Sequence, residues 1–234
     1  MLSAELLEQV KKYEWGQDRE VLTRVSDAVK QMYGNDTETK AVEKQLLSVL
    51  QSQAKYPGKQ FVCRQLRIIG TSQSVPILSM MLTDEETSDM ARYALESIPG
   101  SDIDAALREA LPKAKGKPKI GIINSLGQRR DKQSVEVLGE LVSDSDEMIA
   151  QAAVVALGKI ADEQVTKILV EAKDKAKGKL QSLILDAYLL CADRLVAEGK
   201  KVQALAIYKE LQDQSMPKPI RSAALAGMIN AAKQ

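Results

Sequence analysis

Apolar residues recur along this chain at the spacing of buried helix faces. Between Met148 and Ile160 they occupy positions i, i+1, i+4, i+5, i+8, i+9 and i+12, which is a helical period with a wide apolar face. The most strand-like stretch runs from Phe61 to Ile69, but its apolar positions 62, 63, 66 and 69 fit a helix better than an alternating strand. The pattern therefore predicts an all-α protein.

The helical segments repeat along the chain. Four similar segments are centred on leucines 66, 95, 126 and 157, which are 29, 31 and 31 residues apart, and looser copies pass through Leu190 and Leu225. An offset series of apolar segments lies between them, so each period holds two helices. The stretch Lys113–Lys117 recurs as Lys175–Lys179, an offset of 62 residues, which is twice 31.

Repeats of this length predict a stacked architecture. One helix pair cannot bury its own apolar face, whereas neighbouring pairs can form a continuous core. We expect an α-solenoid, a right-handed superhelix of about seven pairs and fourteen helices, that forms a single domain over residues 1–234. The pairs are expected at 3–33, 37–70, 72–99, 101–129, 131–161, 162–198 and 200–232.

Several residues mark the expected helix ends. Thr83 and Glu86 have the spacing of a capping box, and the acids of Ser143–Glu147 favour a helix start. Pro217 and Pro219 are expected to open the last helix. Six glycines are expected to stop helices: Gly34, Gly70, Gly100, Gly116, Gly178 and Gly199.

Composition removes several kinds of chemistry. The chain has no histidine, which excludes a Ser-His-Asp triad, a Cys-His pair and histidine-ligated metals. Its 33 Lys and Arg balance 32 Asp and Glu, and aromatic residues make up 3%, so there is no general field or stacking platform for nucleic acid. No glycine-rich nucleotide loop is present. We expect no enzymatic activity, no cofactor, no metal and no nucleic-acid partner.

The apolar runs and the two cysteines carry further expectations. No apolar run approaches the 18 or more residues of a membrane span, and no signal peptide is visible, so we expect no membrane insertion. Cys63 and Cys191 lie in apolar helical stretches and are expected to be buried thiols.

Two local motifs resemble a known family. Val75–Leu82 reads Val-Pro-x-Leu-x-x-x-Leu, and a later second helix ends in Ala-Leu-Gly-Lys-Ile at 156–160. These motifs, best matched over residues 59–161, resemble bacterial HEAT-like repeats, the short form also found in phycobilin lyases. Four stretches resemble uncharacterised bacterial HEAT-repeat proteins that are often exported: Tyr13–Gly16, Lys59–Leu66, Met90–Leu95 and Lys119–Gly127. The resemblance implies an exported or periplasmic location, with a cytoplasmic one as the alternative.

The resemblance also implies where a partner would bind. HEAT-like solenoids usually present their second helices on a concave face, and polar residues lie on or just after the expected second helices. The other interpretation is that these residues are solvated or make structural hydrogen bonds between repeats. The candidate partner-binding residues are Arg64, Arg67, Arg92, Tyr93, Asn124, Gln128, Arg129 and Arg130.

Two other features have a structural and a functional interpretation. The only tryptophan, Trp15, is expected to pack over the first repeat and close the N-terminal end, with a ligand platform as the alternative. The basic turns at 113–119 and 175–179 flank an acidic turn at 144–147, which breaks any continuous basic stripe.

These observations lead to one main functional hypothesis. A continuous repeat without a catalytic constellation favours a monomeric, non-catalytic scaffold that binds a protein or peptide on its concave face, either alone or as an accessory module of a larger protein. The resemblance leaves two alternatives. One is a bilin lyase-like chaperone that delivers a chromophore to a phycobiliprotein cysteine. The other is a HEAT-repeat DNA glycosylase, which the net charge of +1 and the single tryptophan disfavour.

Overall fold

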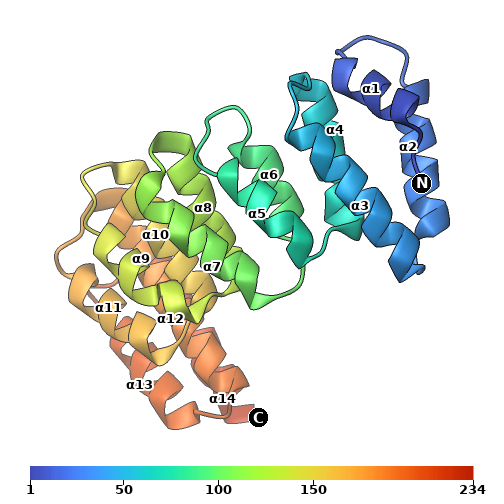
Figure 1. The fold of residues 1–234 in the computed structure, drawn as a ribbon. Helices are drawn as coiled ribbons and strands as arrows, with labels where there is room; N and C mark the ends of the chain where they lie inside the picture. The colour runs from blue at the N-terminus through green and yellow to red at the C-terminus, as the bar shows by residue number, and fades with distance from the viewer. Residues whose placement is uncertain (234) are drawn as a thin grey trace. The chain divides into compact units, whose positions relative to one another are not determined.

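Helices account for all the regular secondary structure that the structure describes, which covers residues 1–233. The structure is a computed structural model, and it forms two compact units, Met1–Ser125 and residues 126–233 (Figure 1). Each of the seven expected ranges contains two α-helices, so the predicted all-α fold, an α-solenoid of helix pairs, is confirmed. The expectation of a single domain stays a prediction.

The first unit contains three complete pairs and most of a fourth. Its α-helices are α1 (Ala4–Lys12), α2 (Glu20–Met32), α3 (Asp36–Leu50), α4 (Tyr56–Ile69), α5 (Val75–Met80), α6 (Ser88–Leu95), α7 (Ser101–Ala110) and α8 (Gly116–Arg129), of which α8 ends in the second unit. Short 3-10 helices precede α5 (η1, Ser72–Ser74) and follow α7 (η2, Leu111–Lys113). The first helices α5 and α7 pack against each other, and so do the second helices α4 and α6.

The second unit is also built of first and second helices. A 3-10 helix, η3 (Lys132–Ser134), leads into α9 (Val135–Leu141), and the remaining helices are α10 (Glu147–Ile160), α11 (Glu163–Lys173), α12 (Gly178–Ala197), α13 (Lys201–Leu211) and α14 (Lys218–Lys233). Here α9 packs against α11, while α10, α12 and α14 form a row of second helices.

Small residues let the second helices of this unit approach closely. Gly127 on α8 faces α10, where an added Cβ would lie 2.6 Å from the Ala156 Cα atom. Gly158 on α10 faces α12, where an added Cβ would lie 2.9 Å from the Ala187 Cβ atom. The two glycines are 31 residues apart and therefore occupy the same position in successive repeats. The repeat length thus places a backbone without a side chain at each close contact.

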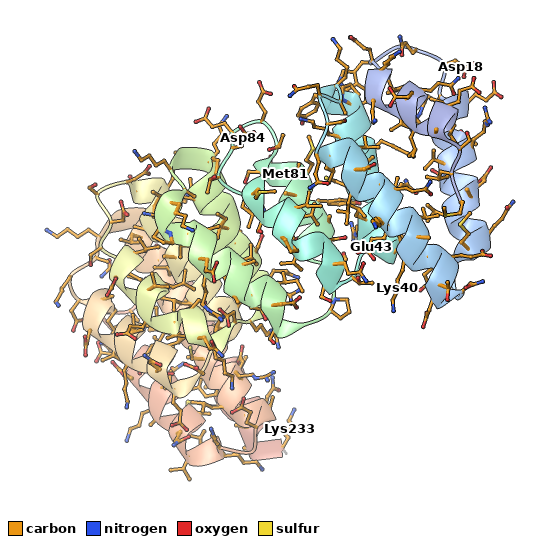
Figure 2. The ribbon with its side chains drawn as sticks, in the orientation of Figure 1. Asp18, Lys40, Glu43, Met81, Asp84 and Lys233 are labelled. Carbon is orange, nitrogen blue, oxygen red and sulfur yellow. The ribbon has the colours of Figure 1, made fainter. Side chains whose placement is uncertain are left out.

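A buried carboxylate joins the second and third pairs. Glu43 on α3 is 0% exposed and lies among the helices, whereas Asp18 and Asp84 project from loops (Figure 2). Its Oε1 atom accepts hydrogen bonds from the Thr71 backbone N–H at 2.7 Å and from the Ser74 hydroxyl at 2.6 Å. Since Thr71 directly precedes η1 and Ser74 is its last residue, Glu43 fixes the beginning of the next repeat.

Some of the expected helix starts are correct. The Asp146 carboxylate accepts a hydrogen bond from the Met148 backbone N–H at the start of α10, and α14 begins between Pro217 and Pro219. The capping box at Thr83 is wrong, because α6 begins only at Ser88. The residue after Thr83, Asp84, organises this turn instead and accepts from the Glu86 and Thr87 backbone N–H groups.

The glycines play two different roles. Gly34, Gly70 and Gly199 follow helix ends as expected, and Gly100 directly precedes α7. For Gly116 and Gly178 the expectation is wrong, because they begin α8 and α12 with φ angles of +50° and +59°. A positive φ suits glycine, and it reverses the chain between the first and second helix of a pair.

Candidate functional site

Two of the predicted residues form a pair on the second-helix surface of the first unit. The Arg67 Cζ atom on α4 lies 4.3 Å from the centroid of the Tyr93 ring on α6, which is a cation–π contact. Tyr93 is 44% exposed, and Arg64 and Asn124 are also exposed. The Arg64 guanidinium donates a hydrogen bond to the Gln60 Oε1 atom, one turn earlier on the same helix. Arg64, Tyr93 and Asn124 therefore face solvent, and their role in partner binding stays a prediction.

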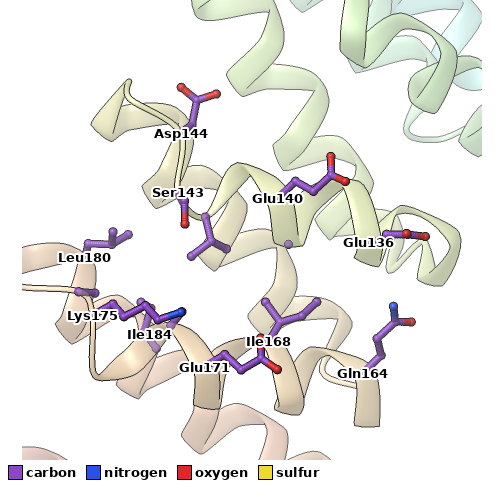
Figure 3. Close-up of a pocket in the computed structure, with 14 residues that line it drawn as sticks. Glu136, Glu140, Ser143, Asp144, Gln164, Ile168, Glu171, Lys175, Leu180 and Ile184 are labelled. Carbon is purple, nitrogen blue, oxygen red and sulfur yellow. The ribbon is translucent and has the colours of Figure 1, made fainter.

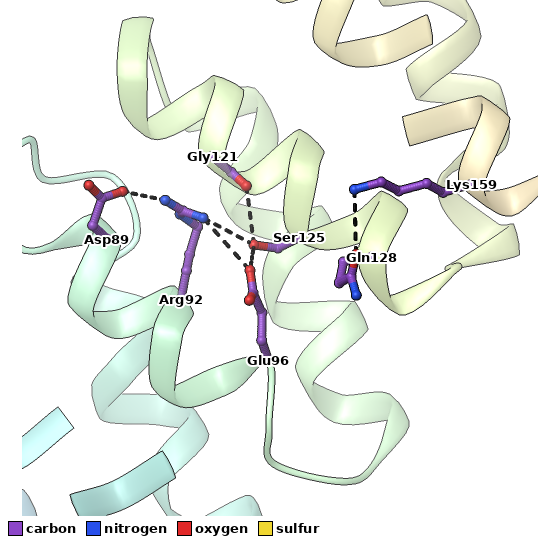
Figure 4. Close-up of polar contacts among 7 residues, drawn as sticks. All are labelled: Asp89, Arg92, Glu96, Gly121, Ser125, Gln128 and Lys159. Carbon is purple, nitrogen blue, oxygen red and sulfur yellow. Dashed lines mark hydrogen bonds and ion pairs between the residues drawn. The ribbon is translucent and has the colours of Figure 1, made fainter. Parts of the chain in front are cut away.

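Arg92 has a different environment, although it is adjacent to Tyr93 in sequence. Its side chain is 16% exposed and pairs with the Asp89 carboxylate, and one guanidinium nitrogen lies 3.7 Å from the Glu96 Oε1 atom. The same nitrogen lies 3.4 Å from the Ser125 hydroxyl on α8 (Figure 4). The backbone of Gly121 makes room for it, since an added Cβ there would lie 2.5 Å from the Arg92 Cζ atom. Arg92 thus links α6 to α8, and its role in partner binding stays a prediction.

The remaining candidates lie at the end of α8, in the second unit. Gln128 accepts a hydrogen bond from the Lys159 ammonium at 3.4 Å, across 31 residues and between two second helices (Figure 4). Arg129 is half-buried and has a contact of its own within the chain. Arg130 is exposed and has a φ of +54°, and it ends α8 in the left-handed conformation.

A small cavity of about 220 Å³ lies in the first unit near the turn between α1 and α2. Trp15 lines this cavity together with Tyr13, Arg19, Phe61 and Arg64. The expectation that Trp15 packs over the first repeat is wrong, because 63% of the residue is exposed in that turn.

A larger cavity, of about 530 Å³, lies in the second unit between α9, α11 and the start of α12. Figure 3 shows Glu136 and Glu140 on the α9 side and Glu171 on the α11 side. Its larger apolar lining residues are Val142, Ile168, Leu180 and Ile184. Sequence reasoning missed this cavity, because acids on the outer side of first helices look like ordinary solvated residues.

The comparisons with known proteins identify the repeat type. Residues 104–187 match the protein family described as HEAT repeats. This part of the chain carries HEAT repeats. Such repeats generally mediate protein binding. The matched range includes α8 to α11 and the larger cavity. No match was found among the curated proteins.

Three solved structures are similar to the chain at low sequence identity. One is the crystal structure of an engineered protein, with 19% identity and a TM-score of 0.48, covering 97% of this chain and 68% of the other. A designed armadillo repeat protein in complex with the peptide (KR)4 has 14% identity and a TM-score of 0.33, with 97% and 98% covered. A second engineered protein has 17% identity and a TM-score of 0.32, with 99% and 98% covered.

The helix pairs bury both thiols, as expected from the sequence. Cys63 and Cys191 are free and buried, and burial raises the pKa of the Cys63 thiol to about 12 and that of Cys191 to about 11. Both are therefore protonated at neutral pH, where a nucleophilic cysteine would need a lowered pKa. Among residues 1–233, no cluster of three or more Cys, Asp or Glu side chains could hold a metal ion. The same residues contain no helix with the length and apolarity to cross a bilayer.

Proposed function

We propose that this protein is a non-catalytic scaffold that binds an acidic protein or peptide segment through the second-helix surface of its first unit. The exposed Arg67–Tyr93 pair carries this proposal. Arginine and tyrosine are enriched among the residues that contribute most to binding at protein interfaces. Here each side chain is attached to a helix packed against its neighbour, so little freedom remains to be lost on binding.

The charges around this pair favour an acidic partner. Arg92 engages the nearby Asp89 and Glu96 carboxylates within the chain, which lowers the local negative field. Arg64 and Arg67 are exposed on α4, where the Arg64 guanidinium donates to an amide oxygen and the Arg67 guanidinium lies over an aromatic ring. A guanidinium can form paired hydrogen bonds to a carboxylate, so an Asp or Glu beside an apolar residue would match this surface.

A photo-crosslinking experiment tests the proposal. A photoreactive phenylalanine analogue at Asn124 should form adducts with the partner in lysate of the native host, and mass spectrometry then identifies that partner. Arg67→Ala and Tyr93→Ala should each reduce the adduct roughly fivefold or more, which is the effect of losing an interface residue worth about 1 kcal/mol or more. Tyr33→Ala is the matched control, since Tyr33 is 70% exposed and lies after α2, so its loss should leave the adduct unchanged.

The proposal fails if the adduct forms equally well with Arg67→Ala and Tyr93→Ala. Circular dichroism of each variant should match the parent protein, so that lost adducts reflect the surface and not the fold. No observation in residues 1–233 favours the chromophore chaperone or the DNA glycosylase over this scaffold.

A further inference from the structure

We propose that the cavity between α9 and α11 is a second binding site, which takes a basic segment of a partner protein that carries an apolar side chain beside its lysines or arginines. The inference rests on the proposed protein-binding function, but it concerns a different surface and the opposite charge. It also lies between two first helices, α9 and α11, and the start of α12, whereas the predicted site is formed by second helices.

The shape of the cavity suits a side chain and its flanking backbone. Its volume of about 530 Å³ lies within the range of about 300–1,000 Å³ that is usual for ligand sites. Gly139 on α9 faces α11, where an added Cβ would lie 2.8 Å from the Ile168 Cδ1 atom. Beyond this close contact the space is lined by Val142, Leu180 and Ile184, so an apolar group that enters is removed from water.

The charge of the cavity specifies a cationic ligand. Its ionisable lining residues are four acids and one lysine: Glu136, Glu140, Asp144, Glu171 and Lys175. Asp144 accepts a hydrogen bond from the Asp146 backbone N–H and so belongs to the turn before α10. By contrast, the exposed Glu140 and Glu171 carboxylates have no ion pair or hydrogen bond with any other part of residues 1–233. They remain free to bind the cations of a partner.

The positions of these two glutamates are unfavourable for the fold itself. Glu140 is the penultimate residue of α9, and Glu171 lies two residues before the end of α11. A helix C-terminus carries a partial negative charge, so an acid in the last turn is destabilising. The two residues are 31 apart and line the same cavity from neighbouring helices. Acids that weaken the fold and have no partner inside it are typical of binding sites, where function and stability compete.

Peptide binding to the intact protein tests this inference. The probe is a fluorescein-labelled, twelve-residue amphipathic peptide of Lys, Leu and Ala, followed by fluorescence anisotropy. Two matched probes replace every Lys by Glu or every Leu by Ser. We expect the Lys/Leu peptide to bind, the Glu peptide not to bind, and the Ser peptide to bind at least about tenfold more weakly, as expected for a lost apolar contact. Binding should weaken steeply with added salt, because the charges are exposed and screened.

Glu140→Gln/Glu171→Gln removes the two charges with little change in size. This double variant should bind the Lys/Leu peptide at least about tenfold more weakly, and it should melt at the same or a higher temperature than the parent protein. Asp186→Asn is the matched control, since it removes an exposed acid from α12 outside the cavity lining and should leave binding unchanged. A general effect of net charge would weaken binding in the control as well.

Several results would overturn the inference. These are no binding of the Lys/Leu peptide, equal binding by the double variant, or equal binding of the Leu-free peptide, which would indicate only a nonspecific polycation surface. The crosslinking assay at Asn124 separates the two proposals. If Tyr93-dependent crosslinking persists while the peptide fails to bind, the second site alone is wrong. If the peptide binds through Glu140 and Glu171 while crosslinking does not depend on Tyr93, the second-helix surface alone is wrong.

Discussion

Gly127→Ala tests whether the close contact between α8 and α10 limits the stability of the second unit. Alanine is the better helix former, and in a helix interior the change from glycine gains about 1 kcal/mol. In this position the new Cβ would lie 2.6 Å from the Ala156 Cα atom and 2.7 Å from the Ala156 Cβ atom. Favourable contacts between carbon atoms occur at about 3.5–4.0 Å, so the two helices would have to separate by roughly 1 Å.

The atoms that Gly127 faces decide the sign of the effect. The Ala156 Cα atom belongs to the backbone, so no change of rotamer can move it away. Overpacking of this kind costs about 1–3 kcal/mol, and the separation also weakens the other contacts between α8 and α10. We expect the cost to exceed the gain in helix propensity and the variant to be less stable by about 1–2 kcal/mol.

Urea unfolding followed by circular dichroism at 222 nm measures this change. Gly139→Ala is the control, because the new Cβ meets the end of a flexible side chain, Ile168 Cδ1, at 2.8 Å. That side chain can rotate, so the control should be within about 0.5 kcal/mol of the parent protein or more stable. The reasoning is refuted if Gly127→Ala is as stable as the parent protein or more so.

The remaining predictions concern buried and paired groups. Glu43→Ala removes the acceptor of two donors, the Thr71 backbone N–H and the Ser74 hydroxyl. It should lower the free energy of unfolding, measured in urea, by about 3 kcal/mol. An effect below about 1 kcal/mol would contradict the proposed role of this carboxylate. Burial raises the pKa of the Cys63 and Cys191 thiols, so the stability they provide is full below their unfolded pKa, near 9, and is lost as pH rises towards about 11 and 12. The urea concentration at the unfolding midpoint should therefore decrease as the pH is raised from 8.5 to 11. Both thiols should react with a disulfide reagent at pH 8 only after unfolding, and rapid reaction of the folded protein would contradict their burial. A double-mutant cycle of Arg67→Ala and Tyr93→Ala should give a coupling of about 0.5–1 kcal/mol, and additive single effects would show that the two side chains do not interact in solution.

Part of the candidate surface could be inferred from the sequence. The 31-residue repeat places Arg67 and Tyr93 on successive second helices, and the structure brings them into contact. The same reasoning could not separate Tyr93 from its neighbour Arg92, because burial depends on the facing helix. Gly121 leaves room on α8 for the Arg92 guanidinium, and this is visible only when α6 and α8 are packed together.

The acidic cavity shows the same limit more clearly. In the sequence, Glu140 and Glu171 are single acids on amphipathic helices, which are usually solvated. Their significance comes from the space between α9 and α11, which Gly139 and Ile168 help to define. No short-range pattern encodes that space, since its lining residues are spread from Glu136 to Ile184.

The sequence by itself determined the class of fold, the number of helix pairs and the burial of both cysteines. These properties follow from which residues prefer to leave water, and the helical period records that preference locally. Only the tertiary structure decided which exposed charges are engaged, where Glu43 is buried and where a cavity opens. The buried carboxylate and the cavity depend on distances between residues of different helices, and those distances are set when the helices pack.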